Sequence, residues 1–521
     1  MPDTPAIEMR RISKSFGSVV ANKDIDLSVQ NGEIHALLGE NGAGKSTLMN
    51  MLSGIYRPDS GSIFVGGQEV RLASPKDSIA KGIGMIHQHF KLVDVMTAAE
   101  NIALGGSGVF LDRKKLEKQI VRLSDRYGLD VVPGKKVYDM SVGEKQTLEI
   151  IKVLYRGARI LIMDEPTAVL TPQEIDKLFT IIRNMKTEGN AIVIITHKLG
   201  EVMEISDRIT VLRRGESIGT LVTRDTDIPT LIEMMVGRRV DLSIGRVPFE
   251  GGLSTGEGTS AGEGASAGGG VGPLLRADGL TVVDHDKKQA LGNVGFELHG
   301  GEILGVAGVA GSGQKELCET IAGLQHAEKG RIFFEGGNIL GKSPRDIIKL
   351  GIRMGFIPED RLGMGLVGSM DIVHNIILKE YQNQKGIVLR RGPSAEKAKK
   401  IVERLEIHTP SIYTPVSKLS GGNIQKVLLG REIDSDPKVL ITAYPVRGLD
   451  IGASYRIYDL LNEQKAKGVG IIFIGEDLDV LLELCDRIMV LSGGRITGVL
   501  NAEYTSKEEI GFLMAGGAGA A

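Results

Sequence analysis

The sequence predicts a protein of the α/β class, made of two homologous halves, each with a parallel sheet covered by helices on both faces. Three observations predict this fold. Apolar runs with the length of buried strands alternate with amphipathic stretches, a glycine-rich loop stands between a predicted strand and a predicted helix, and several phrases of the first half recur in the second.

The glycine-rich loop spans residues 39–47 and fits the pattern G-x-x-x-x-G-K-[ST]. Glycines allow backbone N–H groups to close around phosphate oxygens, Lys45 reaches the β- and γ-phosphates, and Ser46 offers its hydroxyl to Mg²⁺. The apolar run Ile34–Leu38 predicts a buried strand that enters the loop, and residues 46–52 predict a helix whose positive end faces the anion. A glycine-rich turn without a ligand is the alternative, and the flanking strand and helix disfavour it.

Further elements of the parallel sheet follow along the first half. The apolar runs 160–163 and Ala191–Ile195 predict buried strands, and residues 172–185 predict an amphipathic helix between them. Strands that alternate with helices around a phosphate loop are typical of a parallel sheet with helices on both faces.

The repeat defines the domain organisation. Residues 74–77 recur as residues 343–346, which lie 269 positions later, and residues 207–209 recur as residues 486–488, which lie 279 positions later. About ten residues have therefore been gained between these points in the second half. Two homologous halves are expected.

A segment of low complexity separates the halves. Residues 251–272 consist of Gly, Ser, Ala and Thr with an occasional Glu, which predicts a flexible-coil linker, and the last residues form a similar tail. The expected boundaries are a first domain at 1–240, a linker at 241–273, a second domain at 274–515 and a tail at 516–521.

Composition limits the classes of function. The chain of 521 residues has 63 Lys and Arg against 65 Asp and Glu, so no global field would recruit nucleic acid or an anionic membrane. Two cysteines, Cys318 and Cys485, make no disulfide framework and are expected to be buried thiols in a reducing compartment. We expect neither a signal peptide nor a membrane-spanning run, so any membrane role would go through a partner chain.

Four residues of the first half are candidates for chemistry. Asp164 and Glu165 end an apolar strand, where Asp164 could hold Mg²⁺ and Glu165 could polarise a water, although acidic turn residues alone would look the same. His197 follows another strand, where a core or capping role is the alternative. Gln88 stands at a strand-to-loop boundary, where it could contact metal or water or simply be a surface residue.

Taken together, the order of glycine loop, Gln, Ser-Gly motif, Asp-Glu and His resembles the ATP-binding cassette (ABC) ATPases. The Ser-Gly motif reads Met-Ser-Val-Gly-Glu at residues 140–144 and Leu-Ser-Gly-Gly-Asn at residues 419–423. The resemblance covers nearly the whole chain except the linker and the tail. It implies two tandem P-loop ABC ATPase domains, each with a parallel-sheet core, an antiparallel β subdomain and a helical subdomain.

The resemblance also implies roles for single residues. Phe16 would stack on adenine, Gln88 would sense the γ-phosphate and the metal, and His197 would complete the hydrolytic centre. Thr171 lies in the loop that usually carries Asp, so it departs from the family pattern. The residues expected to contact ATP are Phe16, Gly39, Glu40, Asn41, Gly42, Ala43, Gly44, Lys45, Ser46, Thr47, Ser420, Gly421 and Gly422. The expected catalytic residues are Lys45, Gln88, Glu165 and His197, and the expected Mg²⁺ ligands are Ser46, Gln88 and Asp164.

The second half has lost most of these groups. The replacements, with the first-half residue in parentheses, are Gln314 (Lys45), Lys315 (Ser46), Glu316 (Thr47), Glu359 (Gln88), Ala443 and Tyr444 (Asp164 and Glu165) and Glu476 (His197). No Phe, Tyr or Trp between positions 279 and 295 matches Phe16. A shift of one residue turns a side chain about 100° around a helix, so Lys315 cannot replace Lys45. The sequence predicts that this second loop does not hydrolyse nucleotide.

The two halves have lost different groups. The first half keeps the catalytic groups but has Val142 where its signature would have glycine, whereas the second half lost those groups and kept Gly421 and Gly422. If each nucleotide lies between one half's loop and the other half's signature, the intact parts meet in one site. We therefore expect one working composite site, in which Ser420, Gly421 and Gly422 face the γ-phosphate bound by Lys45.

Two fused cassettes with a degenerate second copy resemble the ATP-hydrolysing subunits of simple-sugar uptake transporters. The phrases at residues 87–90, 155–159 and 164–174 look closer to the nucleoside-uptake branch, while residues 418–426 fit either branch. This implies a subunit on the cytoplasmic face of the membrane, two permease subunits docked through the helical subdomain at about 90–139, and an extracytoplasmic solute-binding lipoprotein. A nucleoside leads as the solute, a simple sugar follows, and a riboflavin-like solute is an alternative.

The sequence disfavours two other classes of function. A soluble twin-cassette translation or ribosome factor would carry basic patches for RNA and two working sites, and this sequence has neither. A scaffold that binds ATP without turnover is disfavoured by the complete set of Lys45, Asp164, Glu165 and His197.

Overall fold

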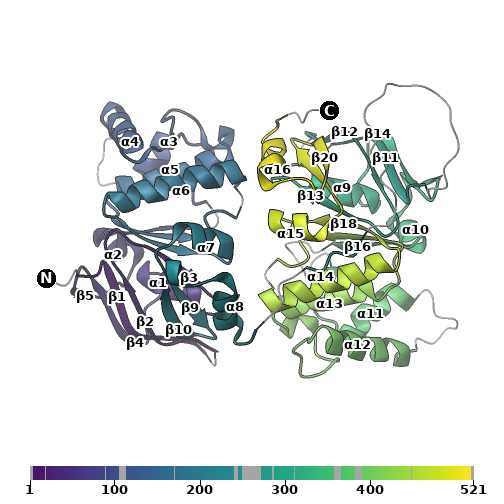
Figure 1. Ribbon diagram of the computed structural model, residues 1–521, viewed down its shortest axis with the longest axis horizontal. Helices are drawn as coiled ribbons and strands as arrows, with labels where there is room; N and C mark the ends of the chain where they lie inside the picture. Colours follow the sequence, from purple (N-terminus) through teal and green to yellow (C-terminus); the bar gives the residue numbers. More distant parts are fainter. Residues whose placement is uncertain are drawn as a thin grey trace. The chain divides into compact units, whose positions relative to one another are not determined.

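The chain forms two compact units, Met1–Asp241 and Leu242–Ala521 (Figure 1). The computed structural model describes residues 4–17, 19–87, 90–104, 113–168, 170–239, 244–248, 272–283, 287–309, 311–356, 365–381, 390–447 and 449–517. Gln88, Glu359, residues 249–271 of the expected linker and the last residues of the expected tail lie outside the described residues.

The first unit is built around a six-stranded sheet with the order β10-β9-β3-β8-β7-β6. Its strands are β3 (Ile34–Leu38), β6 (Ile83–Ile86), β7 (Ile160–Asp164), β8 (Ala191–Ile195), β9 (Arg208–Arg213) and β10 (Glu216–Val222). Neighbouring strands are parallel except for the antiparallel β9–β10 pair. The three strands predicted from apolar runs are confirmed, because β3 and β8 are buried along their whole length and β7 is buried up to its final Asp164.

A second, antiparallel sheet of the first unit has the order β2-β1-β4-β5. Its strands are β1 (Ile7–Phe16), β2 (Val19–Val29), β4 (Ser60–Val65) and β5 (Gln68–Val70). Alternate residues of β1, such as Ile7 and Met9, are buried in one cluster with Leu37 of the parallel sheet and Leu48 of the helix that follows the loop. This cluster joins the two sheets around the glycine-rich loop.

Helices of the first unit form in the three regions where the sequence predicts them, residues 46–52, 172–185 and about 90–139. They are α1 (Lys45–Leu52), α2 (Pro75–Ala80), α3 (Ala98–Ala103), α4 (Arg113–Tyr127), α5 (Val142–Tyr155), α6 (Pro172–Thr187), α7 (Leu199–Ile205) and α8 (Ile228–Val236). Figure 1 shows α3, α4 and α5 grouped at the end of the unit away from β1, β2 and β4, and these three helices contact one another. They form the expected helical subdomain, which extends through α5 beyond residue 139.

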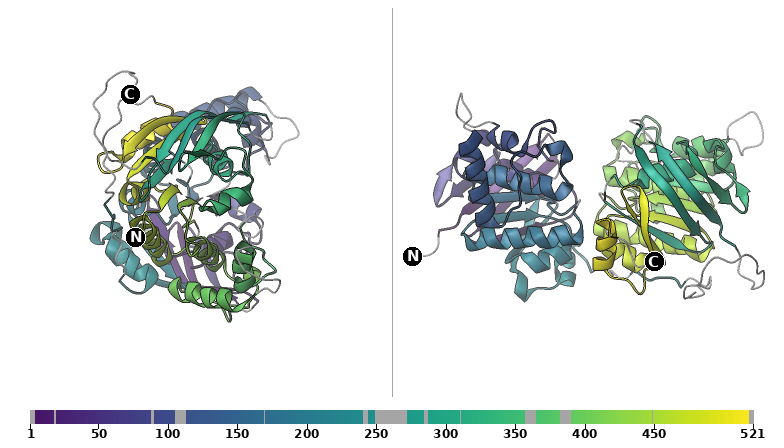
Figure 2. Two further views of the ribbon diagram at one scale, coloured as in Figure 1. Left: turned by 90° about the vertical axis from the view of Figure 1, so that its right-hand side faces the viewer. Right: turned by 90° about the horizontal axis from the view of Figure 1, so that it is seen from above.

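The second unit repeats the architecture. Its parallel sheet has the order β16-β17-β18-β13-β19-β20, and its antiparallel sheet has the order β12-β11-β14-β15. The strands are β11 (Leu275–Val283), β12 (Gln289–Leu298), β13 (Ile303–Ala307), β14 (Lys329–Phe334), β15 (Gly337–Asn338), β16 (Ile352–Phe356), β17 (Val439–Ala443), β18 (Gly470–Ile474), β19 (Arg487–Ser492) and β20 (Arg495–Asn501). Figure 2 shows β11, β12 and β14, coloured teal to green, lying side by side in the right-hand view.

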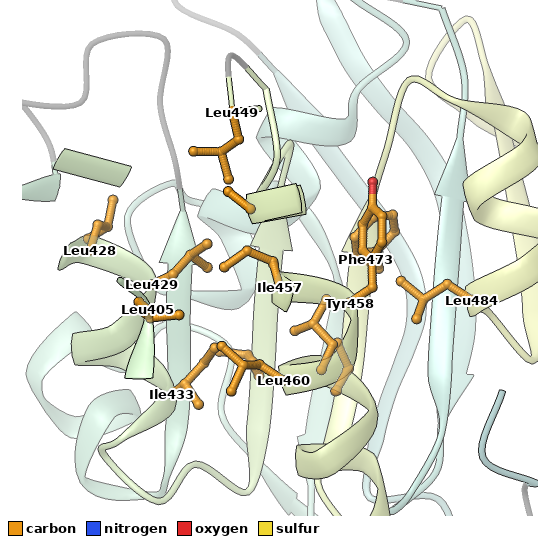
Figure 3. Close-up of a cluster of buried hydrophobic side chains, with 14 of the residues drawn as sticks. Leu405, Leu428, Leu429, Ile433, Leu449, Ile457, Tyr458, Leu460, Phe473 and Leu484 are labelled. Carbon is orange, nitrogen blue, oxygen red and sulfur yellow. The ribbon is translucent and has the colours of Figure 1, made fainter. Parts of the chain in front are cut away.

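The helices of the second unit cover the sheet in the same order. They are α9 (Gln314–Ile321), α10 (Pro344–Lys349), α11 (Ile372–Glu380), α12 (Gly392–Arg404), α13 (Gly421–Ile433), α14 (Ile451–Ala466), α15 (Leu478–Leu484) and α16 (Lys507–Met514). Figure 3 shows the core between these helices and the sheet, where Leu429 of α13, Ile457 of α14 and Phe473 of β18 belong to one buried cluster. The predicted α/β fold with an antiparallel β subdomain and a helical subdomain is thus confirmed in both units.

Two further expectations concern cysteines and membranes. Cys318 and Cys485 are free and buried, as expected, and burial raises the pKa of both thiols far above its ordinary value. Within the described part of the chain, no helix combines the length and the hydrophobicity needed to cross a bilayer.

Candidate functional site

The backbone of the glycine-rich loop adopts conformations that only glycine takes at low cost. Gly39, Gly42 and Gly44 have φ values of 156°, 84° and 98°. A Cβ on Gly39 would lie 2.4 Å from the carbonyl oxygen of Leu212, and a Cβ on Gly44 would lie 2.4 Å from the carbonyl oxygen of Ala21. The loop therefore needs glycine at these positions, and two of its glycines are required by neighbouring backbone as well as by φ.

Two other segments of the same chain form hydrogen bonds that support the loop. Asn22 of β2 donates from Nδ2 to the carbonyl oxygen of Gly44 at 3.2 Å, and the backbone N–H of Gly215 donates to the carbonyl oxygen of Ala43 at 3.2 Å. Asn22 is completely buried. No local sequence pattern marks these contacts, because they come from a strand before the loop and a turn about 170 residues after it.

Lys45 is the first residue of α1 and is buried. Its ammonium donates to the carbonyl oxygens of Gly39 at 2.5 Å and Glu40 at 3.0 Å, so it lies inside the loop. Burial lowers the pKa of Lys45 below its ordinary value, and the carboxylates of Glu165 and Asp164 oppose that shift. The structure thus brings the predicted lysine together with both predicted carboxylates.

Asp164 and Glu165 stand at the carboxyl end of β7 and differ in their protonation behaviour. Burial, and then the charge of Glu165, raise the pKa of Asp164 above its ordinary value. A hydrogen bond from His197 lowers the pKa of Glu165, against the effect of burial. A cation near Asp164 would stabilise its charged form, whereas Glu165 is already stabilised as a carboxylate.

His197 is positioned to act on Glu165. Its Nδ1 lies 3.0 Å from Oε1 of Glu165, and its side chain is 59% exposed. Glu165 itself has a positive φ of 47°, and its backbone N–H donates to the carbonyl oxygen of Ile195 at 2.8 Å. The ends of β7 and β8 therefore hold these two side chains side by side, with the imidazole open to solvent.

The residues expected to hold Mg²⁺ supply hard oxygen donors. Ser46 is exposed on the first turn of α1, and Asp164 is half-buried at the end of β7. A hydroxyl and a carboxylate are ligands that Mg²⁺ prefers, so both residues fit the metal chemically. Gln88, the third expected ligand, lies outside the described residues.

An aromatic pair lies on the surface of the antiparallel subdomain. Phe16, at the end of β1, is 44% exposed, and its ring packs edge-to-face on Tyr56 with centroids 5.2 Å apart. The ammonium of Lys14 lies 5.6 Å from the centroid of the Phe16 ring. The ring of Phe16 is thus partly exposed, and its stacking on adenine stays a prediction, while Tyr56 was missed because no motif marks it.

Thr171 has a structural role at the start of α6. Its hydroxyl accepts a hydrogen bond from the backbone N–H of Glu174, and the Glu174 carboxylate accepts one from the backbone N–H of Thr171, which makes a capping box. Asp450 caps α14 at the matching place in the second unit. The departure from Asp therefore preserves the helix start.

The glycine-rich loop of the second unit keeps the backbone conformation of the first loop but lacks its buried positive charge. Gly311 and Gly313 have φ values of 86° and 103°, close to those of Gly42 and Gly44. Gln314 is buried and donates from Nε2 to the carbonyl oxygen of Val309 at 3.2 Å, so a neutral amide occupies the place that Lys45 occupies in the first unit.

The neighbouring residues of that second loop do not restore the missing groups. Lys315 points outward, is 62% exposed and lies 3.9 Å from the carboxylate of Glu319. Tyr444, at the end of β17, keeps the positive φ of Glu165, at 51°, without a carboxylate. Glu476 lies 3.8 Å from the guanidinium of Arg447.

Both signature motifs begin a helix. Ser141 is the N-cap of α5 and Ser420 is the N-cap of α13, and each hydroxyl accepts from a backbone N–H three residues later, at 3.2 Å and 3.4 Å. Ser420 and Gly421 are exposed, and Gly422 is half-buried. The N-terminus of α13 thus presents a serine hydroxyl and two glycines to solvent within the second unit.

Comparison with known proteins agrees with this geometry. The ABC transporter family model matches residues 22–168 and 291–445. The chain is 45% identical to the guanosine import ATP-binding protein NupO of Bacillus subtilis, over 98% of this chain and 97% of that protein. It is 41% identical to the nucleoside import ATP-binding protein NupA of Lactococcus lactis subsp. cremoris, over 99% of both chains. It is 40% identical to the glucose import ATP-binding protein TsgD13 of Haloferax volcanii, over 99% of this chain and 97% of that protein. The chain therefore belongs to the ABC transporter family, as an ATPase with two ATP-binding cassettes.

Proposed function

We propose that this chain is the ATP-hydrolysing subunit of an importer for a small polar solute, with a nucleoside as the first candidate. The names of NupO and NupA, and the similarity over nearly the whole of each chain, support the nucleoside. The similarity to TsgD13 keeps a simple sugar as the second candidate. The chain would sit on the cytoplasmic face of the membrane, bound to two permease subunits and served by an extracytoplasmic solute-binding protein.

The observation that carries the ATPase assignment to the first cassette is the meeting of Lys45, Asp164, Glu165 and His197 at one edge of its sheet. Lys45 would contact the β- and γ-phosphates, since its ammonium already lies inside the loop. Glu165 would orient and polarise the attacking water, and His197 would hold the Glu165 carboxylate in place through the 3.0 Å contact.

The metal and the base complete the proposal for this site. Ser46, Asp164 and Gln88 would hold Mg²⁺, which when bound neutralises phosphate charge as it develops. Phe16 would stack on adenine, with Tyr56 packed against the edge of its ring. The N–H groups at the start of α1 would complete the phosphate contacts, because no side chain caps that helix.

The second cassette would bind nucleotide without hydrolysing it. The amide of Gln314 replaces an ammonium, and Ala443 and Tyr444 replace the two carboxylates. Loss of one group that stabilises transition-state charge costs about 3 kcal/mol, or roughly a hundredfold or more in rate. The losses do not add linearly, but one or two suffice to make turnover negligible.

The second cassette would still contribute to hydrolysis through its signature. In the composite site we propose, Ser420, Gly421 and Gly422 face the γ-phosphate bound by Lys45. The support is that the cassette with the catalytic groups has Val142 in its own signature, whereas the cassette without them keeps both glycines. Random loss, the alternative, would not need to sort the changes in this way.

Transport would follow from a shift in conformational populations. ATP bound between the two cassettes favours their closed arrangement, and hydrolysis removes that preference. The permease subunits would sense closure through the helical subdomains, and the access of their solute site would change in response.

Solute uptake by the reconstituted transporter tests the proposed function. Proteoliposomes would hold the permease pair together with this subunit, with the solute-binding protein outside and ATP inside, and uptake of labelled guanosine, ribose and riboflavin would be compared. We expect ATP-dependent guanosine uptake that is lost with Glu165→Gln. Uptake of ribose alone would support the second candidate, and failure of the subunit to bind any permease would contradict the importer assignment.

A further inference from the structure

We propose that residues 244–248, called here the anchor segment, fix the chain between the cassettes to the second cassette, so that the true joint is only the few residues before it. The segment lies within the range expected as a flexible linker, yet it belongs to the second unit. The functional consequence drawn below rests on the proposed association of the two cassettes, whereas the docking of the segment does not.

Side chains of the second cassette hold the backbone of the anchor segment. Asn462 of α14 donates from Nδ2 to the carbonyl oxygen of Gly245 at 2.9 Å. Lys465 of the same helix donates from Nζ to the carbonyl oxygen of Val247 at 2.5 Å. Ile244 adds an apolar contact, because it packs against the main core cluster of this cassette.

The anchor segment also contributes a charge to the end of a helix. The guanidinium of Arg246 donates to the carbonyl oxygens of Leu482 and Glu483 in the last turn of α15. These carbonyl groups have no partner within the helix, and a cation there also interacts favourably with the helix dipole. Arg246 therefore caps α15 from outside the helix.

Equivalent ion pairs in the two cassettes can be compared within this chain. Lys186 and Asp207 form an ion pair at 2.5 Å with side chains 35% and 38% exposed. Lys465 and Asp486, at the equivalent positions, form a pair at 2.6 Å with side chains only 1% and 8% exposed.

The anchor segment supplies a hydrogen-bond acceptor to the buried second pair. In each cassette the aspartate also accepts from the first backbone N–H of the loop strand, Ile34 or Ile303, at 2.9 Å. Burying an ion pair is costly unless its remaining donors are satisfied, and the carbonyl of Val247 supplies that acceptor to Lys465. The second cassette thus has a built receptor for this segment, whereas the equivalent pair of the first cassette stays partly exposed.

Anchoring shortens the connection between the cassettes. Helix α8 ends at Val236 and the anchor segment begins at Ile244, so about seven residues join the two. Without the anchor, the connection would run from α8 to β11 and would contain about 38 residues. Since effective concentration falls roughly as the −3/2 power of linker length, release of the anchor would lower the effective concentration of one cassette at the other by about tenfold.

Trypsin cleavage of the full chain tests the docking directly, because Arg238, Arg239 and Arg246 are the only tryptic sites between α8 and Arg276. The side chain of Arg239 is 92% exposed. We expect cleavage after Arg239 and protection after Arg246 by at least tenfold, measured by intact mass. Equal rates at the two sites in the wild-type chain would overturn the proposal.

Single substitutions distinguish a loss of the anchor contacts from a general loss of stability. Asn462→Ala and Lys465→Met should each raise the cleavage rate after Arg246 at least tenfold without changing the rate after Arg239. Lys186→Met in the first cassette is the matched control and should leave both rates unchanged. If Lys465→Met unfolds the cassette, Asn462→Ala alone decides, because it removes one hydrogen bond and no charge.

The functional consequence has its own readout. Excision of residues 252–268 should change the ATP concentration for half-maximal hydrolysis less than twofold, whereas 17 added Gly/Ser residues after Arg239 should raise it several-fold. The opposite ranking would overturn the assignment of the joint. Absence of any ATPase activity would instead count against the proposed function, and the proteolysis result would be unaffected.

Discussion

His197 and Glu165, which follow two adjacent strands of the first cassette, are held 3.0 Å apart from Nδ1 to Oε1. The positive φ of Glu165 turns its side chain at the end of β7, and the hydrogen bond from its N–H to Ile195 fixes that turn against β8. The pKa of Glu165 is lowered chiefly by this imidazole. The residue that positions the proposed base therefore also favours its ionised form.

Removal of the His197 imidazole should change the pH dependence of hydrolysis. His197→Ala removes the largest cause of the lowered pKa of Glu165, and burial then raises that pKa. The carboxylate would be protonated at higher pH, so the acidic limb of the kcat profile should move to higher pH. Single-turnover rates between pH 5 and 8 measure the shift, on top of a roughly hundredfold loss at neutral pH.

His197→Gln is the control for that shift. Its amide can still donate to the carboxylate, so its acidic limb should lie closer to the wild-type position than that of His197→Ala. An unchanged limb in both variants would mean that Glu165 does not limit the reaction.

The two loops should respond differently to the same truncation. Lys45→Ala removes an ammonium from the proposed phosphate contact and should lower kcat by at least about a hundredfold. Gln314→Ala removes a neutral amide from the equivalent position and should change kcat less than about threefold. Steady-state ATPase assays of both variants, with circular dichroism as a check on folding, measure the difference. Equal losses would refute the asymmetry between the cassettes.

Alanine substitutions at Gly42 and Gly44 should differ in their effect on the free energy of unfolding, although both glycines have positive φ. A Cβ on Gly44 would lie 2.4 Å from backbone and side-chain atoms of β2, whereas nothing lies within 4 Å of a Cβ on Gly42. Gly42→Ala should cost about 1 kcal/mol from the backbone conformation alone, and Gly44→Ala should cost about 1–3 kcal/mol more. Urea unfolding without nucleotide compares the two. A smaller cost for Gly44→Ala than for Gly42→Ala would contradict the packing.

Phe16 should contribute to the affinity for the base and not for the phosphates. Phe16→Ala should weaken ATP binding by roughly 5- to 100-fold, since stacking on an aromatic ring is worth about 1–3 kcal/mol per base. Affinity for inorganic triphosphate should stay unchanged, and Phe16→Trp should retain ATP binding. Calorimetric titration gives both affinities, and equal weakening of the two ligands would exclude a stacking role.

The sequence predicts the fold well where burial is continuous. Ala191–Ile195 is apolar throughout and Ile34–Leu38 is apolar apart from the buried His35, so their ends as strands follow from the pattern alone. The same holds for Lys45, Asp164 and Glu165, because a local motif or a strand end marks each of them.

Other parts of the site carry no local signal. Asn22, Tyr56 and the turn at Gly215 support or extend the loop from distant positions, and only tertiary packing brings them there. The anchor segment lies within the expected linker, because nothing in the sequence of its five residues distinguishes a docked segment from a free one. Its partners, Asn462 and Lys465, lie more than 200 positions away.

One pair of charge substitutions tests whether the signature of the second cassette acts on the ATP bound by Lys45. Asp is as good an N-cap as Ser, so Ser420→Asp and Ser141→Asp should each preserve the helix that begins there. A carboxylate near the γ-phosphate is repulsive. We expect Ser420→Asp to lower kcat at least about a hundredfold, while Ser141→Asp, which would face the degenerate loop, changes it less than about threefold. Equal losses, or a larger loss from Ser141→Asp, would contradict this expectation.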